Sequence, residues 1–324
     1  STGNTRETKN YQYTAGAAPS GIPQKITVND GYSKSTISNG MYYVFPSEKS
    51  WVAAYDNKGI LRGLIPTESY HGRRITASED CILYQISNNK IAKVSSLGRV
   101  IGVIQMKGYG KIRDFSYDGY NEVYWLGKKK RNEYLLATSF QTGKTRVVYR
   151  FKKGIFAGSL TAPQSGTIGV VPKNPSGLIY LDAITAAKPK ISFVVGKKAS
   201  WKKVVAKKKI KEDKKFTGWN TKQSMLLAQE NETTPAMLVQ EENQYLAVEW
   251  QADVAKKTVQ KKASATAAEA KSGSQIQKRG NNYVIVCGRA GTYLEMGTDG
   301  KAIRRYNCGS GLDSVQKLKL SGMC

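Results

Sequence analysis

One pattern of short apolar strands recurs along this chain and limits the folds that it can adopt. Each copy holds an apolar strand, a polar break, a second apolar strand, a turn that often ends in Gly, and a third strand. The turns read DNKG, SSLG, FQTG and TDGK, and the fifth copy lacks the turn glycine. The copies begin at residues 41, 81, 122, 167, 224 and 282.

A further short strand is expected before each copy, as in "RRITAS" before the second and "IRDFSY" before the third. Each unit would then be a sheet of four antiparallel strands. Such a sheet cannot bury both of its faces alone, so a repeat of about 40 residues favours a propeller, in which each sheet packs between two others. The sequence predicts an all-β protein, a six-bladed β-propeller of four-stranded antiparallel blades.

Composition changes mark the predicted limits of the domain. Residues 1–25 are polar and rich in Gly, Ser and Thr, and we expect a flexible N-terminal arm. The propeller would occupy 26–324, with a basic insertion at 197–215 and an Ala/Lys-rich insertion at 251–273. Either "PQKITVN" or "SVQKLKL" could supply the strand that closes the ring.

The formal net charge of +27 predicts attraction to polyanions, with an affinity that falls as salt is added. The basic insertion is the candidate polyanion-binding segment, since stacking on its tryptophan would add to its charge. An equally open interpretation is a solvated loop. The residues predicted to bind are Lys197, Lys198, Trp201, Lys202, Lys203, Lys207, Lys208, Lys209 and Lys211.

The sequence also bears on nucleic-acid binding, membrane insertion and location. No motif of specific nucleic-acid recognition is present, and no apolar run approaches the roughly 20 residues of a transmembrane helix. The chain opens on Ser1 rather than Met, and we expect an exported, processed form at the cell surface or outside the cell. The predicted partner is an anionic polymer or surface, and self-association through the arm is an alternative.

The four cysteines and single histidine predict no metal site, because no Cys-x-x-Cys spacing occurs. Cys287 and Cys308 flank one predicted three-strand unit. A disulfide between them in an oxidising compartment and two buried or idle thiols are equally compatible with the sequence. No cofactor is predicted.

Several segments together resemble the arylsulfate sulfotransferase family of six-bladed propellers. They are the strand led by His71, the turn YDNKG, the segment RDFSYD and the closing GNNYVIVCGRAGTYLEMGTDGKAIRRY, and the resemblance covers about residues 40 to 308. It implies sulfate transfer between phenols through a sulfated histidine, helped by other groups in the central channel. In this comparison His71 matches one channel histidine, and Asn220 matches a channel asparagine.

The chain differs from that family at the positions of its catalytic residues. Arg113-Asp114 stands where the family has His-Asp, and the nucleophilic histidine is replaced within Ser274-Gln275-Ile276-Gln277. Only His71 could then act as the nucleophile. We therefore expect an exported, non-catalytic binding or structural module. The alternatives are a divergent aryl sulfotransferase that uses His71, and a subunit of an extracellular assembly.

The inner strands of a propeller line its channel, and five residues are expected to form a polar ring there. Such a ring either holds an anion such as sulfate or carboxylate, or only keeps the channel wet and polar. The five residues are His71, Arg113, Ser159, Asn220 and Gln275.

Overall fold

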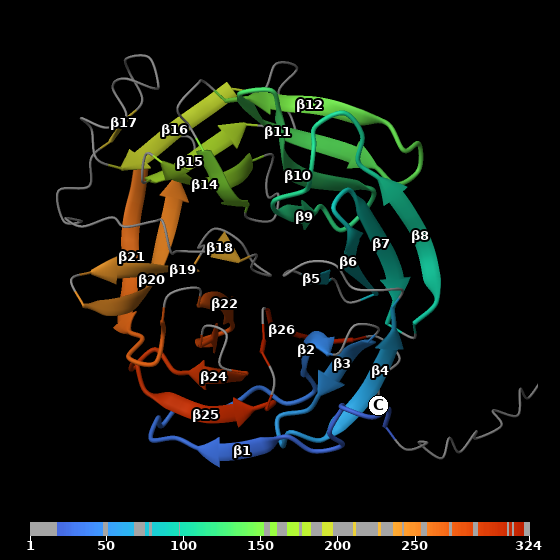
Figure 1. Cartoon of the computed structure of the whole chain (residues 1–324). Helices are drawn as coiled ribbons and strands as arrows, with labels where there is room; N and C mark the ends of the chain where they lie inside the picture. Colours follow the sequence, from blue (N-terminus) through green and yellow to red (C-terminus); the bar gives the residue numbers. More distant parts are fainter. Residues whose placement is uncertain are drawn as a thin grey trace, which may run out of the picture.

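A computed structural model shows an all-β protein, with six sheets and no helix among the residues that it describes. These sheets stand around a common centre (Figure 1). The described residues are 18–47, 51–67, 75–77, 80–96, 98–151, 156–160, 167–174, 177–182, 190–196, 210–211, 226–227, 236–241, 243–253, 258–271, 274–287, 291–309, 311–312 and 314–320.

The first two sheets have the orders β26-β2-β3-β4 and β5-β6-β7-β8, from the inner strand outward. Their strands are β26 (Gln316–Leu318), β2 (Tyr42–Ser47), β3 (Trp51–Tyr55), β4 (Leu61–Pro66), β5 (Ile75–Ala77), β6 (Cys81–Ser87), β7 (Lys90–Ser95) and β8 (Val100–Gln105). The next two have the orders β9-β10-β11-β12 and β13-β14-β15-β16-β17. Their strands are β9 (Phe115–Tyr117), β10 (Glu122–Lys129), β11 (Asn132–Ser139), β12 (Thr145–Arg150), β13 (Phe156–Leu160), β14 (Thr167–Asn174), β15 (Gly177–Asp182), β16 (Lys190–Gly196) and β17 (Ile210–Lys211).

The last two sheets have the orders β18-β19-β20-β21 and β22-β23-β24-β25-β1. Their strands are β18 (Leu226–Leu227), β19 (Ala236–Glu241), β20 (Gln244–Asp253), β21 (Thr258–Thr266), β22 (Gln275–Arg279), β23 (Asn282–Val286), β24 (Thr292–Met296), β25 (Ala302–Asn307) and β1 (Thr27–Asp30). Pairing is antiparallel throughout the described strands, except that β17 lies parallel to β16.

Both segments proposed for ring closure are used. β26, near the C-terminus, pairs with β2 and completes the first sheet from the inside. β1, near the N-terminus, pairs with β25 on the outside of the last sheet. The inner strands contact one another in the circular order β26, β5, β9, β13, β18, β22 and back to β26. Both ends of the described chain therefore hold the first and last sheets together.

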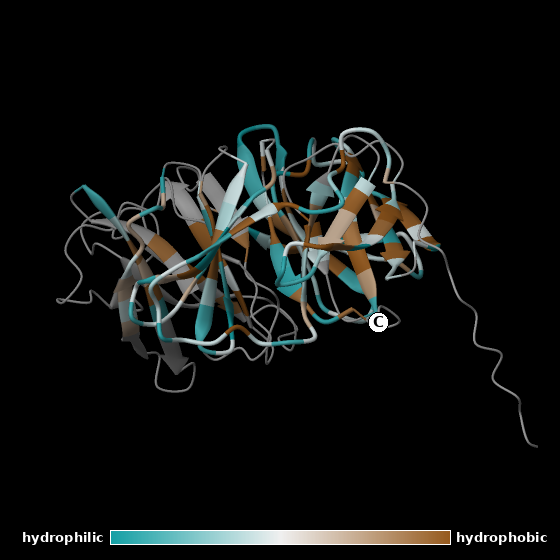
Figure 2. Ribbon diagram, turned by 90° about the horizontal axis from the view of Figure 1, so that it is seen from below, coloured by the Kyte–Doolittle hydropathy of each residue, from teal (hydrophilic) through white to brown (hydrophobic). Residues whose placement is uncertain are grey.

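The core lies between neighbouring sheets because the middle strands are apolar on both faces. In β10, Tyr124 belongs to a cluster shared with β13, β14 and β15, whereas the adjacent Trp125 belongs to one shared with β6, β7 and β8. Successive side chains of a strand point to opposite faces, so one continuous apolar run serves two interfaces. Figure 2 shows apolar stretches inside the strands and hydrophilic residues in many of the hairpins.

The N-terminal arm is shorter than predicted. Ile22 is buried, Lys25 forms a β-bridge with Ile60, and the Tyr55 hydroxyl donates a hydrogen bond to the Pro23 carbonyl at 2.6 Å. Residues 22–25 are therefore held in place, with residues 23–25 bonded to β3, β4 and the turn between them, and the prediction of a flexible arm is wrong for these residues. Residues 1–17 of the predicted arm lie outside the described residues.

The Ala/Lys-rich insertion predicted at 251–273 is also wrong over most of its length. Residues 258–266 form β21, which pairs with β20 along its whole length. The predicted fifth copy was placed one strand too early, because its first apolar pair, Leu226–Leu227, is the inner strand β18. An outer strand has few apolar residues, so it is hard to recognise from apolar alternation in the sequence. Pairing with β20 also overrides the helical propensity of alanine and lysine.

Candidate functional site

The predicted channel residues are only partly within the described structure. His71 and Asn220 lie outside the described residues, and so do Lys197 to Lys209 of the basic segment. Ser159 lies on the inner strand β13 and Gln275 on the inner strand β22. Gln275 is buried. The inner-strand positions agree with the expected geometry, and the polar ring itself stays a prediction.

The Arg113-Asp114 pair has structural partners. The Arg113 guanidinium makes an ion pair with Glu133 of β11 at 2.7 Å, and thus reaches outward across its own sheet. The buried Asp114 carboxylate accepts a hydrogen bond from the backbone N–H of Leu160 in β13 at 2.7 Å. The Asp114 carboxylate therefore joins the third sheet to the fourth.

A buried ion pair lies at the point where the ring closes. Lys317 of β26 is 1% exposed and Glu295 of β24 is 0% exposed, and the ammonium lies 2.9 and 2.6 Å from the two carboxylate oxygens. Asn282 and the Tyr43 hydroxyl also donate hydrogen bonds to Glu295. The pair joins the first sheet to the last.

Burial governs the protonation of this cluster. It lowers the pKa of Lys317, and the nearby Glu295 carboxylate acts in the opposite direction. The pKa of Tyr43 is raised, first by burial and then by the charge of Glu295, so its hydroxyl stays protonated and donates. Three groups, Lys317, Asn282 and Tyr43, donate to one buried carboxylate, so we interpret the cluster as a structural link between the first and last sheets.

A second buried carboxylate joins two other sheets. Glu249 of β20 accepts hydrogen bonds from the Tyr283 hydroxyl of β23, at 2.5 Å, and from the ammonium of Lys278 in β22. Both donors lie in the last sheet, whereas Glu249 lies in the preceding one. Buried charge in the described structure thus recurs at sheet junctions.

Six exposed cations lie on two adjacent loops. One loop follows β8 and the other is the hairpin between β10 and β11. The Lys128 N–H donates to the Tyr109 carbonyl at 2.8 Å, which holds the two loops side by side. We name as the basic loop cluster the exposed Lys107, Lys111, Lys128, Lys129, Lys130 and Arg131.

The basic loop cluster has few carboxylates near it in sequence. Residues 81–113 contain no Asp or Glu, and Glu133, just beyond the hairpin, is buried against Arg113. The backbone of the hairpin tip is also unusual, because Lys130 has a φ of 55° without being glycine. The sequence "GKKKR" at this two-residue turn was a signal for a second basic site, whereas polyanion binding was predicted only for the longer lysine run.

An aromatic residue, Tyr109, packs between the basic loop cluster and the core. The Lys129 ammonium lies 5.4 Å from the centroid of the Tyr109 ring. That ring meets Trp125 and Tyr134 edge to face, with centroids 6.4 and 4.9 Å apart. The half-buried Tyr109 therefore ties the charged loops to the core beneath them.

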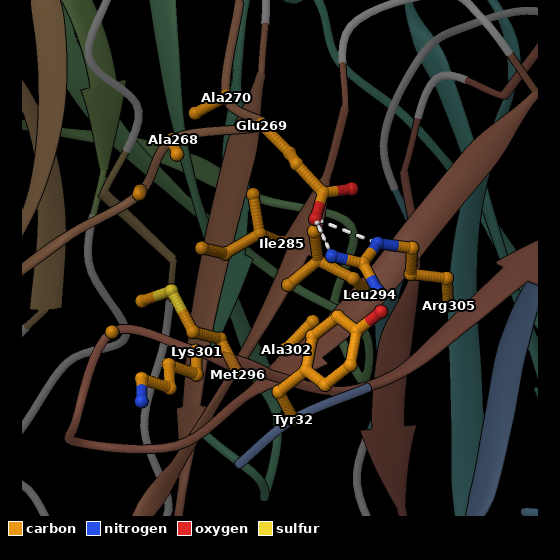
Figure 3. A pocket seen from close by; sticks show the side chains of 12 residues that line it. Tyr32, Ala268, Glu269, Ala270, Ile285, Leu294, Met296, Lys301, Ala302 and Arg305 are labelled. Carbon is orange, nitrogen blue, oxygen red and sulfur yellow. Dashed lines mark hydrogen bonds and ion pairs between the residues drawn. The ribbon is translucent and has the colours of Figure 1, made fainter. Parts of the chain in front are cut away.

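A pocket of about 330 Å³ lies at the junction of the last two sheets (Figure 3). Its base is apolar. Glu269 and Arg305 point toward one another on one side, with the Arg305 Nε 2.7 Å from the carboxylate, and Lys301 lies on the other side. This arrangement can take a small apolar group whose polar end faces the charged rim. The apolar lining includes Ala267, Ala270, Ile285, Leu294, Met296 and Ala302.

Of the two alternatives left open for Cys287 and Cys308, the structure shows two free thiols and no disulfide between them. The Cys287 N–H bonds to Thr292 and the Cys308 N–H bonds to Gly291, so the chain of β24 runs between them. Two strand spacings amount to roughly 9.5 Å, which exceeds the Cα separation of about 4.4–6.8 Å that a disulfide needs.

Both thiols are expected to react slowly while the protein is folded. Burial raises the pKa of Cys287 to about 12 and the pKa of Cys308 to about 12, from 9.0 in each case. The thiolate fraction at pH 8 is then about a thousandfold lower than for an ordinary thiol. Mass spectrometry after iodoacetamide treatment should show both residues unmodified in buffer and modified in guanidinium. Rapid labelling of either one in buffer would contradict this.

Two further findings concern membrane-spanning helices and similarity to known proteins. In the part of the chain that the structure describes, no helix is long and apolar enough to cross a membrane. Comparison with protein-family models gives no match, and comparison with curated proteins gives none either. The solved structures, in contrast, include many similar folds.

The similar structures are alike in shape and distant in sequence. A chain of a nidogen/laminin complex has a TM-score of 0.56 at 11% identity, covering 88% of this chain and 100% of that one. A functionally unknown protein from Desulfotomaculum acetoxidans DSM 771 has a TM-score of 0.54 at 8% identity, covering 86% and 99%. A protein of unknown function from Bacteroides caccae has a TM-score of 0.51 at 11% identity, covering 87% and 100%. These likenesses support a β-propeller fold and, at such low identity, nothing finer.

Proposed function

We propose that this protein is a six-bladed β-propeller that acts as a non-catalytic binding module, and that it holds a linear anionic polymer on the basic loop cluster. The observation that carries this proposal is the pairing of two cation-rich loops around Tyr109, with no carboxylate in residues 81–113. The net charge of +27 supports it, because long-range attraction would bring any polyanion toward the surface.

The six sheets and the circular contacts of their inner strands support six blades. Sulfotransferase-like ancestry, export and location at an anionic cell surface belong to the same proposal and rest on the sequence resemblance and the charge. A divergent sulfotransferase is the weaker alternative, since Asp114 holds two sheets together and Arg113 is paired with Glu133. His71, on which that alternative depends, lies outside the described residues.

Phosphate and sulfate polymers share the chemistry that such a surface recognises. Cations spaced along two loops meet successive anionic groups, and binding releases the counterions of the polymer. For a single-stranded phosphate polymer that contacts all six cations, the logarithm of the affinity should fall with the logarithm of salt concentration with a slope of roughly −4.

Neutralising the hairpin tests the proposal. The variant Lys128→Gln/Lys129→Gln/Lys130→Asn/Arg131→Gln should bind fluorescein-labelled oligo(dT) about 100-fold more weakly in 0.1 M salt, and its salt slope should shrink by about 3. Asn is chosen at residue 130 because it tolerates the positive φ. Fluorescence anisotropy across a salt series measures both quantities, and competition with heparin or polyphosphate tells sulfate polymers from phosphate polymers.

A matched control removes the same charge elsewhere. Gln at the exposed Lys25, Lys58, Lys144 and Lys301 also lowers the net charge by four, without touching the basic loop cluster. This control should bind within about threefold of the parent if the loops form the site. Equal weakening of the two variants would reject the site and leave only diffuse attraction by net charge.

A further inference from the structure

The outer edge of the second sheet is unusually apolar. β8 is the last strand of its sheet, and no described strand pairs with its outer edge. Val100 is 54% exposed, Ile101 is 53% exposed and Val103 is 50% exposed. Ile101 and Val103 share a face of the strand because side chains alternate. Figure 1 places β8 at the periphery of the ring.

The other sheets of this protein protect their outer edges. β4 carries Arg62 and Pro66, and β12 carries Arg146 and Arg150, all of which oppose the addition of another strand. The sequence of β21 contains two lysines. β25 and β16 are covered by β1 and β17. β8 reads VIGVIQ, with no charge and no proline. It is the one described outer edge that is neither charged nor covered.

An edge of this kind can bind a strand. Its outward N–H and C=O groups have no ladder partner in the described structure, and a pairing segment would satisfy them while burying the exposed aliphatic side chains. The protein already binds strands in this way, since β1 adds to the outside of β25 through four residue pairs. Such a segment would bury Ile101 and Val103.

The charge around β8 indicates which strand would bind. Lys90 lies opposite Gln105 of β8 in the sheet. Arg99 immediately precedes the strand and Lys107 follows it by two residues, whereas residues 81–113 contain no carboxylate. A second copy of this chain would bring another charge of +27 to the same place. An extended segment with acidic residues alternating with aliphatic ones fits both the charge and the apolar face.

We propose that β8 is the docking edge for an extended acidic-aliphatic segment of a partner protein, which adds as a further strand outside the second sheet. The segment pairs with the backbone of β8 and packs its aliphatic side chains on Ile101 and Val103. Its carboxylates meet the surrounding cations. The docking strand β8 itself contains no residue of the basic loop cluster.

A substitution that adds positive charge distinguishes β-strand pairing from purely electrostatic attraction of the peptide. Val103→Lys places a charge in the docking edge, so it should weaken binding of the labelled peptide Ac-EVEVEVE-NH2 at least tenfold. If the peptide were held only by charge, the added lysine would strengthen binding. The matched control is Val147→Lys, since Val147 is 46% exposed on the outer strand β12. It should bind the peptide within about twofold of the parent.

A second measurement uses the parent protein alone. Ac-EVEPEVE-NH2 keeps the charge but cannot extend a strand through its centre, and it should bind at least tenfold more weakly than Ac-EVEVEVE-NH2. Equal binding of the two peptides, or tighter binding by Val103→Lys, would overturn the proposal. Fluorescence anisotropy gives the affinities, and thermal melts confirm that both valine variants are folded.

Discussion

Replacing Lys317 by Met should lower the free energy of unfolding by about 3–5 kcal/mol, because it leaves the buried Glu295 carboxylate without its cation. The ammonium contacts both carboxylate oxygens, and its side chain is 1% exposed, so water cannot take its place. The loss falls at the junction of the first and last sheets, where β26 closes the ring. Urea unfolding followed by tryptophan fluorescence measures it.

Two controls decide whether the loss belongs to the ion pair. The double variant Lys317→Met/Glu295→Gln removes both charges, and should recover to within about 2 kcal/mol of the parent. Lys301→Met, at an exposed cation, should change stability by less than about 0.5 kcal/mol. A double variant as unstable as Lys317→Met would show that packing of the lysine stem, and not its charge, stabilises the junction.

Replacing Trp125 by Ala should destabilise the protein by a similar amount, about 3–5 kcal/mol, because it removes the largest fully buried side chain among the described residues. The indole N–H also donates to the Thr138 hydroxyl at 3.0 Å. The ring packs between the second and third sheets and meets Tyr109 edge to face. Trp125→Ala should therefore also make the basic loop cluster more mobile, because Tyr109 loses the ring against which it packs.

Trp125→Phe separates these two effects. Phe keeps an aromatic ring against Tyr109 but loses volume and the hydrogen bond, so we expect a loss of about 1–2 kcal/mol and oligo(dT) binding close to that of the parent. Trp125→Ala, measured at a temperature where it is still folded, should bind oligo(dT) more weakly. A loss below 1 kcal/mol for Trp125→Ala would contradict the packing described for this ring.

Sequence reasoning was most successful where a strand is buried on both faces. The segments EVYWL and NYVIV were predicted as strands and form β10 and β23, because their apolar runs serve two interfaces at once. It failed at β21, whose Thr-Val-Gln-Lys-Lys start lies at the solvent edge of its sheet. It also failed at residues 22–25, where a polar segment is held by the buried Ile22 and by backbone bonds to the first sheet.

The repeat, the β class and the positive charge could be read from the sequence alone, because they depend on local alternation of side chains and on counting ionisable groups. Which of the charges are buried and which are exposed depends on how the strands pack together. Lys317 and Lys129 are alike in the sequence, yet one lies against Glu295 inside the closing junction and the other over Tyr109 at the surface. That difference arises from strands brought together across nearly the whole chain, as Tyr43 and Glu295 are, and no local pattern records such a distance.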